Sequence, residues 1–142
     1  MTDTRPLDAE TLLFTGQVQG LILSCFENER PLQGLAGKLD WRLRGMLSDF
    51  LRAGSITGKA GECCYVPVRW HERTLHLFLA GGGYLTEGMK RPELPPASWE
   101  KLKTNLKSLR VGSMAVSIAD LGGIDAATVK ARLTGLEVQV TA

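Results

Sequence analysis

The segment from residue 35 to residue 52 constrains the fold most, because its apolar residues recur at spacings of three and four. These residues are Leu35, Leu39, Leu43, Met46, Leu47, Phe50 and Leu51. This spacing places them on one side of an α-helix, and most of the charged residues fall on other sides. Gly54 follows the last turn, where a left-handed cap is expected. The pattern predicts one helix over 35–52 that must bury its apolar side against another element, with Gly45 as its one interior weakness.

Apolar runs typical of strands alternate with helical patterns along the rest of the chain. We expect strands over 20–26, 63–69, 74–80, 114–118 and 136–140, and further helices from Trp99, capped by Ser98, and from Asp125. The runs at 63–69 and 74–80 are close enough for a hairpin, whose first strand lies at a sheet edge because Pro67 cannot donate to a ladder. This order predicts an α/β fold with three layers, α/β/α, around a mixed sheet.

Length, composition and charge exclude several classes of protein. The 142 residues suit one domain, which we place at 11–142 after a flexible tail at 1–10. A hydrophobic fraction of 44% argues against disorder, and a net charge of +2 gives no reason to expect nucleic-acid binding. No apolar run reaches the ~20 residues of a membrane helix, and the first ten residues lack a signal-peptide core. Three cysteines without a framework spacing indicate reduced thiols, and hence a cytoplasmic location.

One stretch carries a resemblance to a known family. It reads Leu39-Asp40-Trp41-Arg42-Leu43 with Gly45, followed by Leu47, Leu51, Arg52, Gly54, Gly58 and Gly61-Glu62, and later Leu77-Phe78-Leu79-Ala80-Gly81-Gly82-Gly83. In these features the chain resembles the amino-terminal domain of leucyl aminopeptidases over roughly residues 20–140. The resemblance implies a macro-domain-like fold.

The same resemblance implies that the chain is not an enzyme. In leucyl aminopeptidases the two-metal site belongs to a separate carboxy-terminal domain with an Asn-Thr-Asp-Ala-Glu-Gly-Arg stretch, and no such stretch occurs here. The chain ends at Ala142, where that domain would begin, so a stand-alone domain and a fragment of a longer aminopeptidase both stay open. We therefore expect no catalytic residues and an interaction, assembly or regulatory module. Its partner would be another protein or a second copy.

The histidines and cysteines, which are the usual metal ligands, do not have the spacing that a metal site requires. His71 and His76 lie five apart, which suits neither a strand nor a helix, and neighbouring Cys63 and Cys64 would point to opposite faces of a strand. Glu27 and Glu29 belong to a charged loop, which we interpret as a solvated turn. We expect no metal and no cofactor.

The run Gly81-Gly82-Gly83 is the candidate ligand site. It follows an apolar strand, where backbone N–H groups can cradle a phosphate. The resemblance to macro domains, which bind ADP-ribose through glycine-rich loops at strand ends, supports an alternative function as a binder of ADP-ribose or another phosphate-bearing small molecule. A tight turn that needs positive φ angles explains the same three residues without any ligand.

Two surface features remain open. Lys101, Lys103 and Lys107, with Lys90, Arg91 and Arg110, form a basic patch, which we interpret as the solvated side of a helix. Trp41 lies off the leucine stripe. It either packs on a sheet edge or is exposed as an interface anchor.

Overall fold

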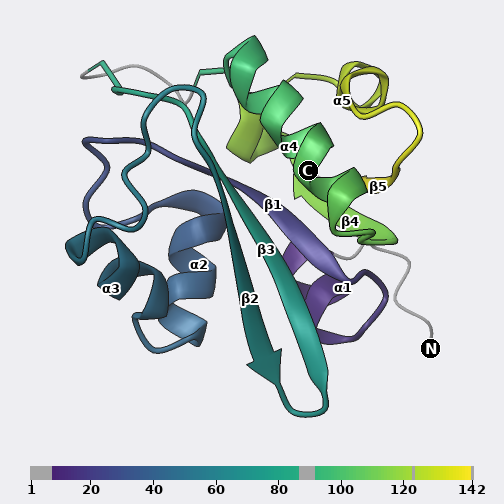
Figure 1. Cartoon of the computed structure of the whole chain (residues 1–142), viewed down its shortest axis with the longest axis horizontal. Coiled ribbons are helices and arrows are strands. Elements are labelled where there is room, and N and C mark those ends of the chain that lie inside the picture. The colour runs from purple at the N-terminus through teal and green to yellow at the C-terminus, as the bar shows by residue number, and fades with distance from the viewer. Residues whose placement is uncertain (1–7, 87–91, 123, 142) are drawn as a thin grey trace.

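The computed structural model describes residues 8–86, 92–122 and 124–141, which form a five-stranded sheet between two layers of helices (Figure 1). The elements in chain order are α1 (Ala9–Phe14), β1 (Gly20–Cys25), α2 (Gly34–Arg42), α3 (Met46–Arg52), β2 (Cys63–Trp70), β3 (Arg73–Gly81), α4 (Pro96–Ser108), β4 (Ser113–Ser117), the 3-10 turn η1 (Ile118–Leu121), α5 (Ala126–Arg132) and β5 (Glu137–Thr141). The predicted α/β/α architecture with a mixed sheet is confirmed.

The sheet has the strand order β2-β3-β1-β4-β5. Strand β1 is central and runs parallel to β3 and β4, and β5 runs parallel to β4. Only β2 is antiparallel, paired with β3 as the predicted hairpin. Because β2 lies at the edge, exposed Pro67 costs the ladder no inner hydrogen bond. The carboxyl ends of four parallel strands therefore meet at one end of the sheet.

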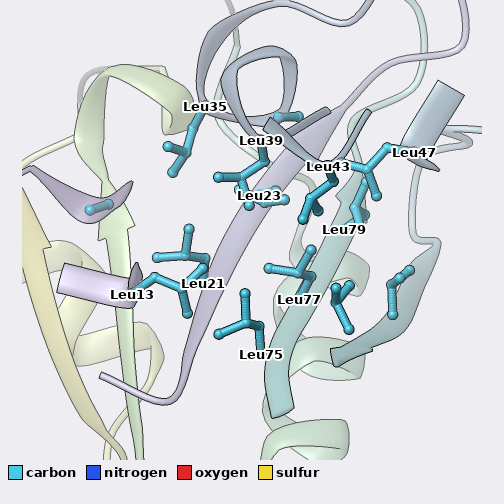
Figure 2. Close-up of a cluster of buried hydrophobic side chains, with 14 of the residues drawn as sticks. Leu13, Leu21, Leu23, Leu35, Leu39, Leu43, Leu47, Leu75, Leu77 and Leu79 are labelled. Atoms are coloured by element: carbon cyan, nitrogen blue, oxygen red, sulfur yellow. The ribbon is translucent and has the colours of Figure 1, made fainter. Parts of the chain in front are cut away.

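The larger core lies between the sheet and helices α1, α2 and α3. Figure 2 shows its leucines pointing toward one another from both layers, with Leu21 and Leu23 on β1 and Leu77 on β3 facing Leu39 of α2. All four side chains are fully buried. On the opposite face of the sheet, α4 and α5 cover a second core, which includes Ile22, Phe78, Trp99, Leu102, Leu106, Met114, Val129 and Leu133. The sheet is therefore covered by a hydrophobic core on each of its two faces.

The single helix predicted over 35–52 is wrong, because the structure has two helices there. Arg44 and Gly45 take positive φ values of 58° and 81°, which end α2 and start α3. The Asp40 carboxylate accepts hydrogen bonds from the Ser48 N–H, at 3.0 Å, and from the Ser48 hydroxyl, so it links the two helices across the break. Both helices still face the same core, with Leu43 and Leu47 buried, which explains why the leucine spacing continued across the break.

The start of α4 also differs from the prediction. The helix begins at Pro96 instead of Trp99, and Ser98 lies in its first turn instead of capping it. The buried Ser98 hydroxyl donates to the Gly81 carbonyl oxygen at 2.8 Å and accepts from the Gly61 N–H at 3.1 Å. Ser98 therefore fastens α4 to the end of β3.

The ordered domain begins earlier than residue 11. Asp8 caps α1, where its Oδ1 accepts from the Thr11 N–H at 2.7 Å, and Ala9 is buried in the larger core. Residues 8–10, which we assigned to the tail, are thus part of the domain, and residues 1–7 lie outside the described part of the chain. None of the helices in the described ranges is long and apolar enough to cross a membrane.

Candidate functional site

The end of the sheet between β1 and β4 is where the chain changes sides. After β1 the chain turns into α2, which packs on the larger core, whereas after β4 it continues through η1 to α5 on the opposite face. In open α/β sheets, neighbouring parallel strands whose connections leave to opposite faces open a crevice beyond their carboxyl ends. This position is therefore the first place to look for a ligand site.

A crevice of about 200 Å³, bordered by several polar side chains, lies at this position. The residues around it are Asp8, Ala9, Glu10, Gly34, Leu35, Lys38, Ser117, Ala119, Asp120 and Thr141. They come from α1, α2, η1 and the last residues of β4 and β5, so the fold gathers them from distant parts of the sequence. Three carboxylates, those of Asp8, Glu10 and Asp120, and the ammonium group of Lys38 border the crevice. The carboxylates can accept hydrogen bonds from a ligand, and the ammonium group can pair with a negative group.

Asp120 forms the floor of this crevice and is itself buried, with 3% of its surface exposed. Its Oδ2 accepts from the Ser24 N–H at 2.9 Å, and its Oδ1 accepts from the Leu35 N–H at 3.3 Å. The Ser24 hydroxyl lies 2.6 Å from the Asp120 carbonyl oxygen and 3.0 Å from Oδ2. Asp120 thus places a carboxylate at the positive amino-terminal end of α2, a position that an anionic ligand would otherwise favour.

An open hollow of about 760 Å³ adjoins the crevice between α1 and α2. Three residues, Glu10, Gly34 and Lys38, border both spaces. Trp41 borders the hollow but not the crevice, and 85% of its surface is exposed. Arg42 joins the two helices, since its guanidinium lies 3.1 Å from Glu10 and 3.8 Å from the Phe14 ring centre. The crevice and the hollow are therefore neighbours with a shared border, and together we call them the depression.

The predicted phosphate site at Gly81, Gly82 and Gly83 does not offer free N–H groups. The three amides donate to the carbonyl oxygens of Glu62, Cys25 and Gly58 at 2.7, 2.9 and 2.9 Å. A Cβ on Gly82 would come within 2.2 Å of the Phe26 ring, and one on Gly81 within 2.0 Å of the Lys59 carbonyl oxygen. Close packing explains Gly81 and Gly82, and a φ of 85° explains Gly83. Phosphate binding at this turn stays a prediction, because the three N–H groups that would bind the phosphate already donate to backbone carbonyl oxygens.

The charged loop after β1 is more ordered than a solvated turn. Glu29 is only 6% exposed, and its Oε1 accepts a hydrogen bond from the backbone N–H of Gln33 at 3.4 Å. The interpretation of Glu29 as a solvated residue is therefore wrong, whereas Glu27 is half-buried. The sequence did not predict that Glu29 would bind the backbone of Gln33, which precedes the first residue of α2.

The histidines and cysteines do not assemble into a reactive cluster. His76 Nδ1 lies 2.6 Å from the Tyr65 hydroxyl, and burial lowers the pKa of His76. Burial, helped by the nearby Glu62 carboxylate, raises the pKa of Cys25 to about 12 and that of Cys64 to about 11. Cys63 packs on the second core and Cys64 on the larger one, which confirms that they face opposite sides of the sheet. Among residues 8–86, 92–122 and 124–141, no three His, Cys, Asp or Glu side chains group as a metal site would require.

Sequence reasoning missed the crevice because its residues carry no joint signal. Asp8 was placed in the tail, and Asp120 lies in a short turn with no repeated pattern. Lys38 is, by its spacing, an ordinary charged residue on the polar side of a helix. Trp41 is exposed and does not pack on a sheet edge, and its role as an interface anchor stays a prediction. Of the basic patch, Lys101 and Lys107 are exposed, and Lys90 and Arg91 lie outside the described residues.

Comparison with known proteins identifies the fold but no family by sequence. No protein-family model matches the chain, and no curated protein matches it. Among solved structures, the macrodomain of Thermus aquaticus DarG matches with a TM-score of 0.64 at 17% identity, covering 92% of this chain and 93% of that one. Thermosipho africanus DarTG in complex with ADP-ribose matches with a TM-score of 0.61 at 14% identity, covering 91% of this chain and 39% of that one. The fold is therefore macrodomain-like, as expected.

The aminopeptidase part of the expectation is not confirmed. A mutant of tomato leucine aminopeptidase matches with a TM-score of 0.55 at 18% identity, covering 87% of this chain but 29% of that enzyme. The expectation that this chain is not an enzyme is overturned. It was drawn only from the absence of the metal site of a peptidase. The fold matches a macrodomain over nearly the whole length of both chains, so a missing peptidase site decides nothing about activity.

Proposed function

We propose that this chain binds ADP-ribose or a related phosphate-bearing nucleotide in the depression at the carboxyl ends of β1, β4 and β5. The observation that carries the proposal is the polar crevice formed where the chain changes sides of the sheet. The likeness in fold to a protein whose structure holds ADP-ribose supports it. That likeness concerns the fold, so the argument for the ligand depends on the residues in the crevice.

The side chains around the crevice suit the two kinds of group in a sugar nucleotide. Lys38 is the one cationic side chain among the described residues that line it, and its ammonium group can pair with a phosphate oxygen. Asp8 uses Oδ1 to cap α1, which leaves acceptor capacity on its carboxylate for a ribose hydroxyl or an amino group. The hydroxyls of Ser117 and Thr141 can donate as well as accept.

The buried carboxylate of Asp120 limits where a phosphate would bind. It already accepts from the Leu35 N–H at the start of α2 and repels a second negative charge there. A phosphate group would therefore bind nearer to Lys38, which borders both the crevice and the hollow. This arrangement differs from a glycine-rich cradle at Gly81–Gly83, and the two can be tested separately.

Calorimetric titration of the purified, nucleotide-free protein with ADP-ribose tests the proposal. We expect micromolar binding, about −8 kcal/mol. Lys38→Ala should weaken the affinity at least about tenfold, which is the loss of one charge-assisted contact. Lys107→Ala, which removes an exposed lysine from α4, is the matched control and should leave the affinity unchanged. No heat of binding up to millimolar ADP-ribose, ADP or AMP would refute the proposal.

The interaction-module hypothesis stays a prediction beside this one. Exposed Trp41 and Tyr84, at 85% and 72%, are the described aromatic residues that a protein partner could contact. Measuring the solution mass over a range of concentrations tests self-association, and a constant monomer mass would count against it.

A further inference from the structure

We propose that Trp41 is the platform on which the planar base of the bound nucleotide stacks. The inference rests on the proposed function and adds to it a residue that binds the base of the ligand. Trp41 is 85% exposed, although tryptophan side chains are on average among the more buried ones. Its helix, α2, buries Leu35, Ala36 and Leu39 against the larger core, so the indole is excluded from the side of the helix that stabilises the fold.

The position of Trp41 along α2 puts it on the same side as the cation of the site. Lys38 lies three residues before Trp41, and Gly34 seven residues before it, which are the spacings of neighbours along one helix face. All three residues border the open hollow. A phosphate held by the Lys38 ammonium group therefore has an aromatic surface about one helical turn away, in the direction that leads out of the crevice.

The sizes of the two spaces favour a ligand that occupies both. Sites for small molecules usually measure about 300–1,000 Å³, and the crevice, at about 200 Å³, is too small to enclose a whole nucleotide. The hollow, at about 760 Å³, shares Glu10, Gly34 and Lys38 with the crevice and can hold the remainder. Trp41 is the one aromatic side chain among the described residues that line either space. A ligand anchored by its sugar and phosphate in the crevice would extend its base over that ring.

The wall that carries Trp41 is held in place by its neighbour. The Arg42 guanidinium bridges to Glu10 of α1, at 3.1 Å, and covers the Phe14 ring, at 3.8 Å. These contacts occupy Arg42 and fix the end of α2 against α1. A platform that is already positioned costs a ligand less ordering on binding. Base–aromatic stacking is tolerant of base identity, so adenine and other bases should both be accepted.

Two ligands that differ in whether they carry a base test the proposal. We would titrate wild type and Trp41→Ala with ADP-ribose and with ribose 5-phosphate. Trp41→Ala should weaken ADP-ribose binding about 5- to 150-fold, the range seen when a stacked base loses its aromatic partner. It should leave ribose 5-phosphate binding within twofold of wild type. Trp41→Phe should restore most of the affinity for ADP-ribose.

The controls separate this inference from the proposed function. Leu109→Ala removes another exposed apolar side chain, at the end of α4, and should change neither affinity. Unchanged ADP-ribose affinity in Trp41→Ala, or an equal loss for both ligands, would overturn the stacking role while the binding function stands. Absence of ADP-ribose binding to the wild type would overturn both. Unfolding midpoints of the variants should match that of wild type, because Trp41 is mostly exposed.

Discussion

Asp120 and Ser24 lie 96 residues apart in the sequence, and the Asp120 carboxylate accepts the Ser24 backbone N–H at 2.9 Å in the interior of the protein. This bond joins the turn after β4 to the middle strand β1. The same carboxylate accepts from the Leu35 N–H and so also holds the start of α2. The Asp120 side chain therefore joins η1 to β1 and to the start of α2 at the floor of the crevice.

We predict that Asp120→Ala destabilises the fold by about 3 kcal/mol, because it leaves the buried Ser24 and Leu35 N–H groups without their acceptor. Asp120→Asn keeps one carbonyl oxygen and should cost less. Denaturant unfolding measures both losses. Asp125→Ala, which removes an exposed cap from α5, should cost less than Asp120→Ala. Equal losses in the two alanine variants would show that Asp120 does not have this structural role.

Much of the fold could be predicted because its signals are local. The run from Gly20 to Cys25 is apolar except for Ser24 and is buried at every position, as a central parallel strand should be. Pro67 marks an edge strand, and Asp125 caps α5 as expected. The break at Gly45 was not predicted, because the apolar spacing continues across it and a single glycine within a helix is tolerated.

The crevice could not be predicted for a different physical reason. Asp8, Lys38, Asp120 and Thr141 approach one another only because the carboxyl ends of β1, β4 and β5 meet at one edge of the sheet. Each is an ordinary polar residue in its own segment. The glycine run, in contrast, is conspicuous in the sequence, yet its amides are occupied by the neighbouring backbone.

A side chain at Gly82 should destabilise the protein. A Cβ there would come within 2.2 Å of the Phe26 ring, which is fully buried and cannot move aside freely. We expect Gly82→Ala to lower the free energy of unfolding by about 1–3 kcal/mol, the usual cost of overpacking. Thermal and denaturant unfolding measure it.

The matched control for this variant is Gly112→Ala. A Cβ at Gly112 would lie 3.2 Å from the Gln19 side-chain oxygen, which is a surface contact that can adjust. If Gly112→Ala and Gly82→Ala unfold at the same midpoint, the close packing of Gly82 on Phe26 is not what this position requires.

Glu62 should make stability depend on acid pH. Partial burial opposes its ionisation, but hydrogen bonds from Thr57 and Gly58 outweigh that effect and lower the pKa of Glu62 below its ordinary value of 4.5. Because the folded state lowers this pKa, the stabilisation is fully present above pH 4.5 and is lost as the pH falls through the lowered value. Glu62→Gln should therefore unfold at lower denaturant concentration than wild type at pH 7, and the difference should shrink toward pH 3. A difference that stays constant over this range would contradict the assignment.

The three thiols should react slowly in the folded protein. Burial and the nearby Glu62 carboxylate raise the pKa of Cys25 to about 12 and that of Cys64 to about 11, and burial also raises the pKa of Cys63. The reactive species is the thiolate, so at pH 8 Cys25 and Cys64 should each react with a disulfide reagent more than about a hundredfold slower in the folded chain than in the unfolded chain. Absorbance after mixing with such a reagent, with and without denaturant, measures both rates.

Cys64→Ser should remove the faster of the two slow phases expected from Cys25 and Cys64, because Cys25 is fully buried whereas Cys64 is half-buried. Rapid labelling of Cys25 without denaturant would mean that the end of β1, where it supports the Gly82 amide, opens far more readily than its burial implies.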